Sequence, residues 1–240
     1  SKQIKRVIEE IKYEKFNFLD QIIFVDNRSE DDTINSIKSN IFNNINNSKY
    51  ILIQNDYNYG LGGSHKVIFN YALENNYDYV IILHGDNQAK TSEIKNLYDE
   101  LDINKSHKYD AILGSRFMRN SKLIGYSIIR KYGNIILNYI YTLFKLKSVK
   151  DLGSGLNIFN TNFLKKVNYL EFDDGFTFNM DILLSLINHK ANIKFIPITW
   201  SETDQISNAK ALSVGFKTLN KLFLKSKYKD KFKFTYKRIN

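Results

Sequence analysis

The sequence contains no cysteine, and this absence excludes disulfide bonds, thiolate metal ligands and cysteine nucleophiles. One proline and 11 glycines in 240 residues are too few for a flexible linker between domains. No signal-peptide pattern opens the chain, and no apolar run reaches the roughly 20 residues that a helix needs to cross a bilayer. The longest apolar stretch, Ile135 to Phe144, is interrupted by Asn138 and Thr142, and we interpret it as a core helix.

Apolar residues, by contrast, make up 43% of the chain, with 17 Phe and 16 Tyr, which is enough for a sizeable core. The formal net charge of +10 is concentrated at one end. Residues 206–240 hold ten Lys or Arg and one acidic residue, whereas residues 1–205 hold 25 basic and 24 acidic residues. We therefore expect one domain over residues 1–205 and a basic tail over residues 206–240.

The basic tail also contains six aromatic residues: Phe216, Phe223, Tyr228, Phe232, Phe234 and Tyr236. Basic and aromatic residues together are typical of a segment that binds an anionic membrane surface. A solvated charged face explains the same composition. We expect no nucleic-acid partner, because the rest of the chain adds neither a basic patch nor a binding motif.

Strand-like and helix-like apolar patterns alternate along the chain. The patterns predict strands over 21–25, 50–54, 79–83 and 111–113, and helices over 4–11, 33–41, 62–75 and 92–101. This rhythm indicates an α/β fold with a parallel sheet and right-handed crossovers. Ligands of such sheets bind at the carboxyl ends of the strands.

Polar or glycine-rich segments follow all four predicted strands. They begin at Asp26, Asn58, His84 and Gly114. Asp26 ends a buried strand, where a carboxylate needs a partner, and either a ligand or an Asx-turn into the next helix supplies one. Four such ends at one edge of a sheet predict a binding site.

Asp86 follows the most apolar strand and has Gly85 before it, which lets a phosphate or a metal approach the backbone. A hard cation such as Mg²⁺ or Mn²⁺ binds carboxylate and diphosphate oxygens together, and we expect Asp86 to be a ligand. Gln88 is placed to orient the ion or its waters. His84 is either a further ligand or a side chain that fills space.

The segment Asn58 to Gly63 resembles a phosphate-binding loop only weakly, and we interpret it as a tight turn into a helix. Arg116 is suited to bidentate phosphate contact, and so is Arg130, although a surface salt bridge explains either residue. Asp151 to Gly155 forms a second polar loop, and Asp181 lies on a predicted helix beside aromatic residues. Those aromatic residues form either an acceptor pocket or part of the core.

Six short segments carry a resemblance to a known family, in this order: Val25–Thr33, Asn58–Gly62, His84–Gln88, Gly114–Arg116, Asp151–Gly155 and Phe178–Asp181. They resemble the V-D-D-x-S-x-D-x-T, N-x-G-x-G, D-x-D-x-Q, G-S-R, D-x-x-S-G and F-Q-M-E motifs of glycosyltransferase family 2, in its dolichol-phosphate mannose synthase-like branch. The resemblance implies a GT-A fold, with a mostly parallel, Rossmann-like sheet flanked by helices. It also implies a sugar donor bound as a nucleoside diphosphate, UDP or GDP, and inversion at the anomeric carbon.

The resemblance further implies roles for individual residues. The donor site comprises Asp26, Asn58, Gly60, Gly62, Gly85, Arg116 and Lys210, and the metal site Asp86, Gln88 and His84. Arg130 and Ser154 face the acceptor or the phosphates. The acceptor is lipid-linked or a glycan, either a polyprenyl phosphate or a precursor of a cell-surface polysaccharide. A polyprenyl phosphate needs no base, whereas a sugar hydroxyl needs a carboxylate, for which we expect Asp181 first and Asp151 second.

The sequence departs from the family pattern in three places. The family's opening strand and its P-x-Y-N-E motif align before Ser1, so we expect the sequence to be part of a longer one. His84 replaces the first acid of the D-x-D motif. The family's R-x-x-G-x-S-K motif is reduced to Lys210 in the segment from Asp204.

The leading hypothesis is thus a metal-dependent glycosyltransferase, peripheral at the cytoplasmic face of the cell membrane. One alternative is a nucleotidyltransferase that makes a sugar nucleotide. Another is a non-catalytic paralogue that binds nucleotide, which His84 and the reduced Lys210 segment motivate.

Overall fold

The computed structural model describes residues 2–42, 48–101, 108–203, 211–223 and 234–239. Its helices are α1 (Lys2–Glu14), α2 (Thr33–Ile37), α3 (Gly60–Glu74), α4 (Ile94–Asp99), α5 (Ile128–Lys145), α6 (Thr161–Leu164), α7 (Phe178–Asn188) and α8 (Ala211–Phe223), with a π-helical turn at Lys38–Phe42 and 3₁₀ turns at Thr91–Glu93 and Tyr169–Glu171. Its strands are β1 (Ile22–Asp26), β2 (Tyr50–Asn55), β3 (Tyr79–Leu83), β4 (Ala111–Ser115), β5 (Lys122–Ile124), β6 (Leu156–Asn160), β7 (Ile193–Pro197), β8 (Thr199–Ser201) and β9 (Tyr236–Arg238).

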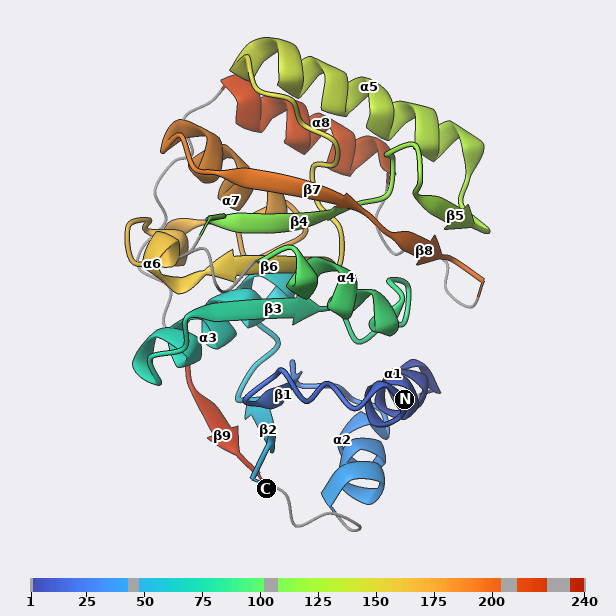
Figure 1. The fold of residues 1–240 in the computed structure, drawn as a ribbon, viewed down its shortest axis with the longest axis vertical. Coiled ribbons are helices and arrows are strands. Elements are labelled where there is room, and N and C mark those ends of the chain that lie inside the picture. Colours follow the sequence, from blue (N-terminus) through green and yellow to red (C-terminus); the bar gives the residue numbers. More distant parts are fainter. Residues whose placement is uncertain (1, 43–47, 102–107, 204–210, 224–233, 240) are drawn as a thin grey trace.

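The strands form three sheets, of order β1-β2-β9, β3-β6-β4-β7 and β5-β8 (Figure 1). The pairs β1–β2, β4–β7 and β5–β8 are parallel, whereas β9 is antiparallel to β2 and β6 is antiparallel to both β3 and β4. The α/β class is confirmed, but the mostly parallel sheet is wrong. The reason is β6, which lies between β3 and β4 and runs against both.

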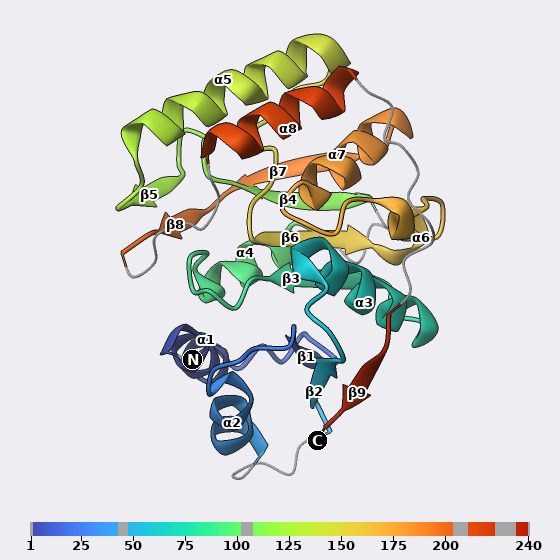
Figure 2. The same ribbon diagram turned by 180° about the vertical axis from the view of Figure 1, so that it is seen from behind.

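Helices cover both faces of the four-stranded sheet. Helix α4 lies over one face, and α3, α6 and α7 lie over the other (Figures 1 and 2). Side chains of β6 alternate between the two resulting cores: Phe159 packs with Phe69 and Phe178, while Ile158 packs with residues of the opposite core such as Leu97. The sheet is therefore fixed on both sides, which gives the loops after its strands rigid anchor points.

The interpretation of Ile135 to Phe144 as a core helix is wrong. Helix α5 has only Asn138 and Tyr141 buried, and most of its apolar side chains are exposed. Helices α5 and α8 lie side by side at one end of the molecule, where the Tyr141 hydroxyl donates to the Thr218 carbonyl at 2.6 Å (Figures 1 and 2). Among the described residues, no helix is long and apolar enough to span a membrane.

The described parts of residues 206–240 belong to the fold. Thr218 of α8 is buried, and β9 adds an antiparallel strand to β2. The remaining residues of the expected basic tail lie outside the described ranges.

Strands β1 and β3 are edge strands that lie next to each other without pairing (Figure 1). Residues of both strands line one cavity of about 1680 Å³, which runs between them. The carboxyl ends of β1 and β3 thus open onto the same space.

Candidate active site

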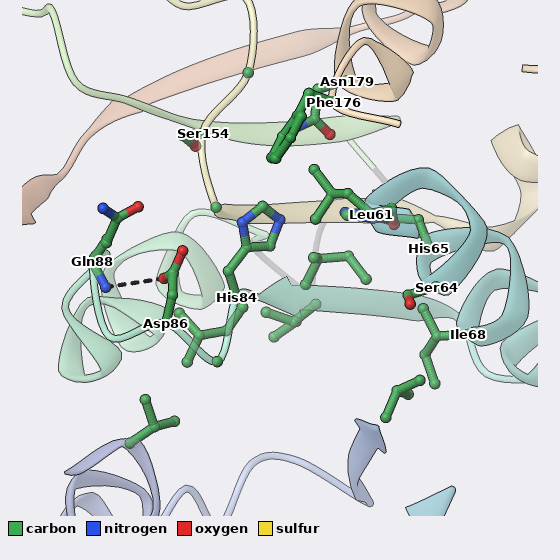
Figure 3. Close-up of a pocket in the computed structure, with 18 of the residues that line it drawn as sticks. Leu61, Ser64, His65, Ile68, His84, Asp86, Gln88, Ser154, Phe176 and Asn179 are labelled. Carbon is green, nitrogen blue, oxygen red and sulfur yellow. Dashed lines mark hydrogen bonds between the residues drawn. The ribbon is translucent and has the colours of Figure 1, made fainter. Parts of the chain in front are cut away.

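The cavity brings together side chains from both strand ends. Asp26 ends β1, and Asp86 and Gln88 follow β3; all three line the cavity, as does Gly85. Figure 3 shows the side chains of Asp86, Gln88 and His84 pointing into the same space. The convergence predicted from strand ends is therefore observed for the first, third and fourth strands, the last of which contributes Arg116.

Asp26 is 2% exposed and has protein partners. Its carboxylate accepts hydrogen bonds from the Ser29 backbone N–H at 3.3 Å and from the Gln54 amide at 3.2 Å. The first contact belongs to the turn that the sequence offered as one explanation. Because Asp26 also lines the cavity, the turn holds a carboxylate at its wall.

The Asp86 carboxylate at this wall has one hydrogen bond and no cationic partner among the described residues. One of its oxygens accepts from the Gln88 backbone N–H at 3.1 Å (Figure 3). Burial raises the pKa of Asp86, and the nearby charge of Glu202 raises it further. Within the described ranges, no Lys or Arg side chain pairs with Asp86. A cation in the cavity would offset the free-energy cost of keeping the Asp86 carboxylate ionised.

His84 is a neutral side chain wedged beside Asp86. Burial lowers the pKa of His84 to about 4, with a further contribution from the charge of Arg116. Its ring lies edge-on to that of His65 at 5.5 Å, and a Cβ at Gly155 would lie 2.9 Å from its Nδ1. His84 Nε2 is buried and has no hydrogen-bond partner in the described part of the chain. The ring therefore fills space and leaves Nε2 without a hydrogen bond among the described residues.

The residues present fit a divalent cation that shares its coordination with a ligand. A carboxylate of raised pKa, the Gln88 amide and an unpartnered imidazole nitrogen border the same cavity. The described residues contain no group of three or more His, Asp or Glu side chains that would hold a metal alone. Diphosphate oxygens would have to complete the coordination of Mg²⁺ or Mn²⁺.

Arg116 is held by protein groups through Nε and Nη2. Its Nε and Nη2 each donate to the Asp151 carboxylate at 2.8 Å, and Nη2 also donates to the Gly153 carbonyl at 2.6 Å. The guanidinium lies 5.1 Å above the Trp200 ring. Arg116 therefore holds the polar loop against the sheet, although it also lines the cavity.

Arg130 lines the cavity with Glu202, a residue that the sequence reasoning missed. The Arg130 guanidinium donates to the Glu202 carboxylate at 2.6 and 3.2 Å and lies 4.6 Å above the Tyr126 ring. Burial raises the pKa of Tyr126. Glu202 and Trp200 flank the end of β8, and the lone tryptophan with an acid two residues on was the signal available.

Neither carboxylate expected as a base reaches the cavity with a free oxygen. Asp181 is 6% exposed and accepts from Lys221 of α8 at 2.5 and 2.6 Å. Asp151 accepts from Arg116 and from the Gly153 N–H at 3.1 Å. The base roles of Asp181 and Asp151 are therefore not supported. Both carboxylates neutralise buried cations instead.

The glycine-rich loop is a turn into α3, as the sequence interpretation preferred. Gly60 has φ +74°, and a Cβ at Gly62 would lie 2.8 Å from Phe178 Cβ. Asn58 accepts from the Asn27 amide at 2.8 Å. None of the three expected donor contacts, Asn58, Gly60 and Gly62, lines the cavity, because this loop packs on the segment before α7.

Two further expected residues remain. The Ser154 hydroxyl is buried at the cavity wall and donates to the Leu156 carbonyl at 3.2 Å, so the protein itself uses it. Lys210 lies outside the described residues.

Comparisons with known proteins identify the family and the fold. Residues 1–167 match the family model described as glycosyl transferase family 2. The chain is 27% identical over 215 residues to the dolichyl-phosphate beta-glucosyltransferase of Saccharomyces cerevisiae, covering 83% of this chain and 62% of that protein, less than two thirds of its length. It is also 27% identical over 233 residues to the UDP-N-acetylglucosamine–dolichyl-phosphate N-acetylglucosaminyltransferase of Methanococcus voltae, covering 93% of this chain and 90% of that protein.

Among solved structures, the glucosyl-3-phosphoglycerate synthase of Mycobacterium tuberculosis, in complex with Mn²⁺, uridine diphosphate and glucosyl-3-phosphoglycerate, is similar to this chain with a TM-score of 0.64. The identity is 12%, and the match covers 99% of this chain and 82% of that one. At this identity the likeness shows the fold, which is the α/β GT-A fold.

Proposed function

The chain belongs to glycosyl transferase family 2, and we propose that it transfers a sugar from a nucleoside diphosphate sugar to a lipid-linked acceptor, a polyprenyl phosphate. One observation carries the proposal. Asp26 and Asp86 end or follow two different strands and line the same cavity, in a fold that in a solved relative holds Mn²⁺ and uridine diphosphate. Asp26 would contact the nucleotide, and Asp86 the diphosphate end.

A divalent cation is part of the proposal. Asp86 and Gln88 would hold it, with His84 beside them, because the Asp86 carboxylate is partly buried without a cationic partner among the described residues. The cation would neutralise charge on the departing nucleoside diphosphate. Uridine diphosphate is the first nucleotide to test, since it appears in the names of two of the similar proteins.

The state of the carboxylates favours a phosphate acceptor over a sugar hydroxyl. A hydroxyl needs a base within hydrogen-bond reach, and both expected bases, Asp151 and Asp181, are engaged in buried ion pairs. A polyprenyl phosphate is already an anionic nucleophile. Its oxygen would form the new bond to the anomeric carbon as the bond to the nucleoside diphosphate breaks, which inverts that carbon.

The acceptor also determines where the enzyme would work. A polyprenyl phosphate stays in the bilayer, so we place the reaction at the membrane surface and, with the nucleotide sugar, at its cytoplasmic face. Arg130 at the cavity wall is the cation we assign to the acceptor phosphate, which would compete with Glu202 for it.

The test compares Asp86→Asn with Asp99→Asn, a control whose carboxylate is exposed on α4 and pairs with Lys95. Uridine diphosphate with Mn²⁺ should raise the midpoint of thermal unfolding of the unmodified protein and of the control. Asp86→Asn should lose the part of this rise that depends on Mn²⁺, and should lose transfer from UDP-sugars to a polyprenyl phosphate.

The pH dependence follows from the raised pKa of Asp86. Only the ionised carboxylate binds a cation, so the Mn²⁺-dependent rise should weaken as the pH falls through that raised pKa. Full Mn²⁺ dependence and full turnover in Asp86→Asn would rule out the proposed role. Nucleotide binding without turnover of any donor would favour a non-catalytic paralogue, and synthesis of a sugar nucleotide would favour the nucleotidyltransferase.

A further inference from the structure

Helix α5 presents a stripe of apolar side chains to the outside of the molecule. Eight of the fourteen large apolar side chains exposed among the described residues are on this one helix, with exposures between 36% and 85%: Ile128, Ile129, Tyr132, Ile135, Ile136, Tyr139, Leu143 and Phe144. Most recur at intervals of three or four residues, so they share one face of the helix. We name this set the α5 face.

The α5 face is a surface at one end of the molecule. Helix α5 is the outermost element there, and α8 and the four-stranded sheet both lie on its inner side (Figures 1 and 2). On α8, the side chain of Phe216 is exposed next to that of Lys217. A contiguous exposed apolar stripe of this size is typical of a surface that binds a partner or a membrane.

The charge around the α5 face has one sign. Residues 111–150 hold eight Lys or Arg and neither Asp nor Glu: Arg116, Arg119, Lys122, Arg130, Lys131, Lys145, Lys147 and Lys150. Arg116 and Arg130 are paired with Asp151 and Glu202. The other six have no acidic partner within the described ranges, and they lie on α5 or in the segments that lead into and out of it.

We propose that the α5 face docks on an anionic lipid bilayer, with α5 lying in the plane of the interface. An apolar face bordered by lysines is the composition of an interfacial helix. Tyr132 and Tyr139 suit this depth, because a tyrosine ring is apolar and its hydroxyl stays hydrated. A second copy of the chain fits less well, since a two-fold dimer would bring the same lysines opposite each other.

This docking deepens the proposed function, on which the choice of a lipid partner partly rests. Ile129, Arg130, Gly133 and Ile136 of α5 also line the cavity. The docked helix would therefore place the cavity wall that carries Arg130 at the depth of lipid headgroups, where a polyprenyl phosphate presents its phosphate.

The experiment measures sedimentation of the full chain with phosphatidylcholine vesicles, with and without phosphatidylserine, in the absence of any sugar donor. The test variant is Tyr132→Ser with Tyr139→Ser. The matched control is Tyr13→Ser with Tyr57→Ser, because these tyrosines lie on other parts of the surface and, at 84% and 70%, are more exposed than the test pair at 59% and 63%. None of the four lines the cavity, and circular dichroism confirms that each variant is folded.

We expect the unmodified chain and the control to bind the anionic vesicles, and the test variant to bind at least tenfold more weakly. Vesicles without phosphatidylserine, or 0.5 M salt, should weaken binding by a similar factor. Equal binding by test variant and control would overturn the docking surface. So would self-association that sedimentation velocity detects without lipid and that the test variant loses.

The two proposals fail separately. Vesicle binding needs no nucleotide, and the Mn²⁺-dependent response to uridine diphosphate needs no lipid. Loss of the first result leaves the sugar-transfer proposal intact, and loss of the second leaves the docking surface intact.

Discussion

The buried ion pair between Arg116 and Asp151 should be costly to break, and Asp151→Asn is the substitution that isolates its charge. The side chains are 12% and 1% exposed. Burial by itself would lower the pKa of Arg116, but Asp151 raises it above its ordinary value. Asparagine keeps the size and one acceptor oxygen, so the variant leaves no cavity and removes the countercharge of a buried guanidinium.

We expect Asp151→Asn to lower the free energy of unfolding by about 3–5 kcal/mol. For a chain of this size, a loss of 1 kcal/mol lowers the midpoint of thermal unfolding by roughly 2–4 °C, so the midpoint should fall by about 6–20 °C. Replacing both partners with apolar residues, as Arg116→Met with Asp151→Leu, should cost less than the single substitution, since it leaves no unpaired charge.

Urea denaturation followed by circular dichroism measures the loss. Asp99→Asn is the matched control, because the Lys95–Asp99 pair is similar in length at 2.7 Å but has side chains 59% and 54% exposed. The control should cost only about 0.3–0.5 kcal/mol. A loss below about 1 kcal/mol in Asp151→Asn would refute the reasoning, since the burial of the pair would then have no energetic consequence.

Two other predictions concern the neighbourhood of the cavity. Burial lowers the pKa of His65 to about 3, with a further contribution from repulsion by His84 when that ring is also protonated. The unfolded chain, with a pKa near 6.5, therefore takes up this proton first, so the contribution of His65 to stability should be full above pH 6.5 and lower by about 2 kcal/mol at pH 5. The lowered pKa of His84 adds a separate loss over the same range. His65→Leu should flatten the loss due to His65 in urea titrations at pH 7.5 and 5, and an unchanged slope would contradict the assignment. Gly62→Ala should destabilise by about 1–3 kcal/mol or more, because the new Cβ collides with the Asp173 carbonyl and Phe178. Gly133→Ala, on a helix with nothing within 4 Å of the new Cβ, should stabilise by up to about 1 kcal/mol; similar changes for both alanines would be the contrary result.

The sequence predicted β1, β2, β3 and β4 because a strand buried on both faces is a short, nearly continuous apolar run. It did not predict β6, where Asn157 and Asn160 interrupt the apolar residues. Both asparagines are buried, and Asn157 donates to the Ser154 carbonyl at 2.9 Å. Strand β6 forms because it pairs with β3 on one side and with β4 on the other, and this pairing exists only in the assembled sheet.

The sequence predicted which side chains reach the cavity where their position at the end of a strand decides it. It did not predict the roles of side chains that depend on a partner far away in the sequence. Asp26 and Asp86 follow from the strand ends alone. The roles of Asp151 and Asp181 depend on Arg116 and Lys221, which are 35 and 40 residues away in the sequence. Helix α5 was misinterpreted for another reason. A 3.6-residue period predicts that a helix has an apolar face, but not whether the rest of the chain covers that face.

The unpaired edges of β1 and β3 face each other across the cavity and leave a channel between the two sheets. Asp26 and Asp86 lie on opposite sides of the channel between these strands, so the width of the channel sets the distance between the two carboxylates. An extended peptide that lay in this channel and formed hydrogen bonds with both β1 and β3 would hold these two strands about 9.6 Å apart, which is two inter-strand spacings. It would join the three- and four-stranded sheets into one. Anything that narrows or widens the channel would therefore change the distance between Asp26 and Asp86.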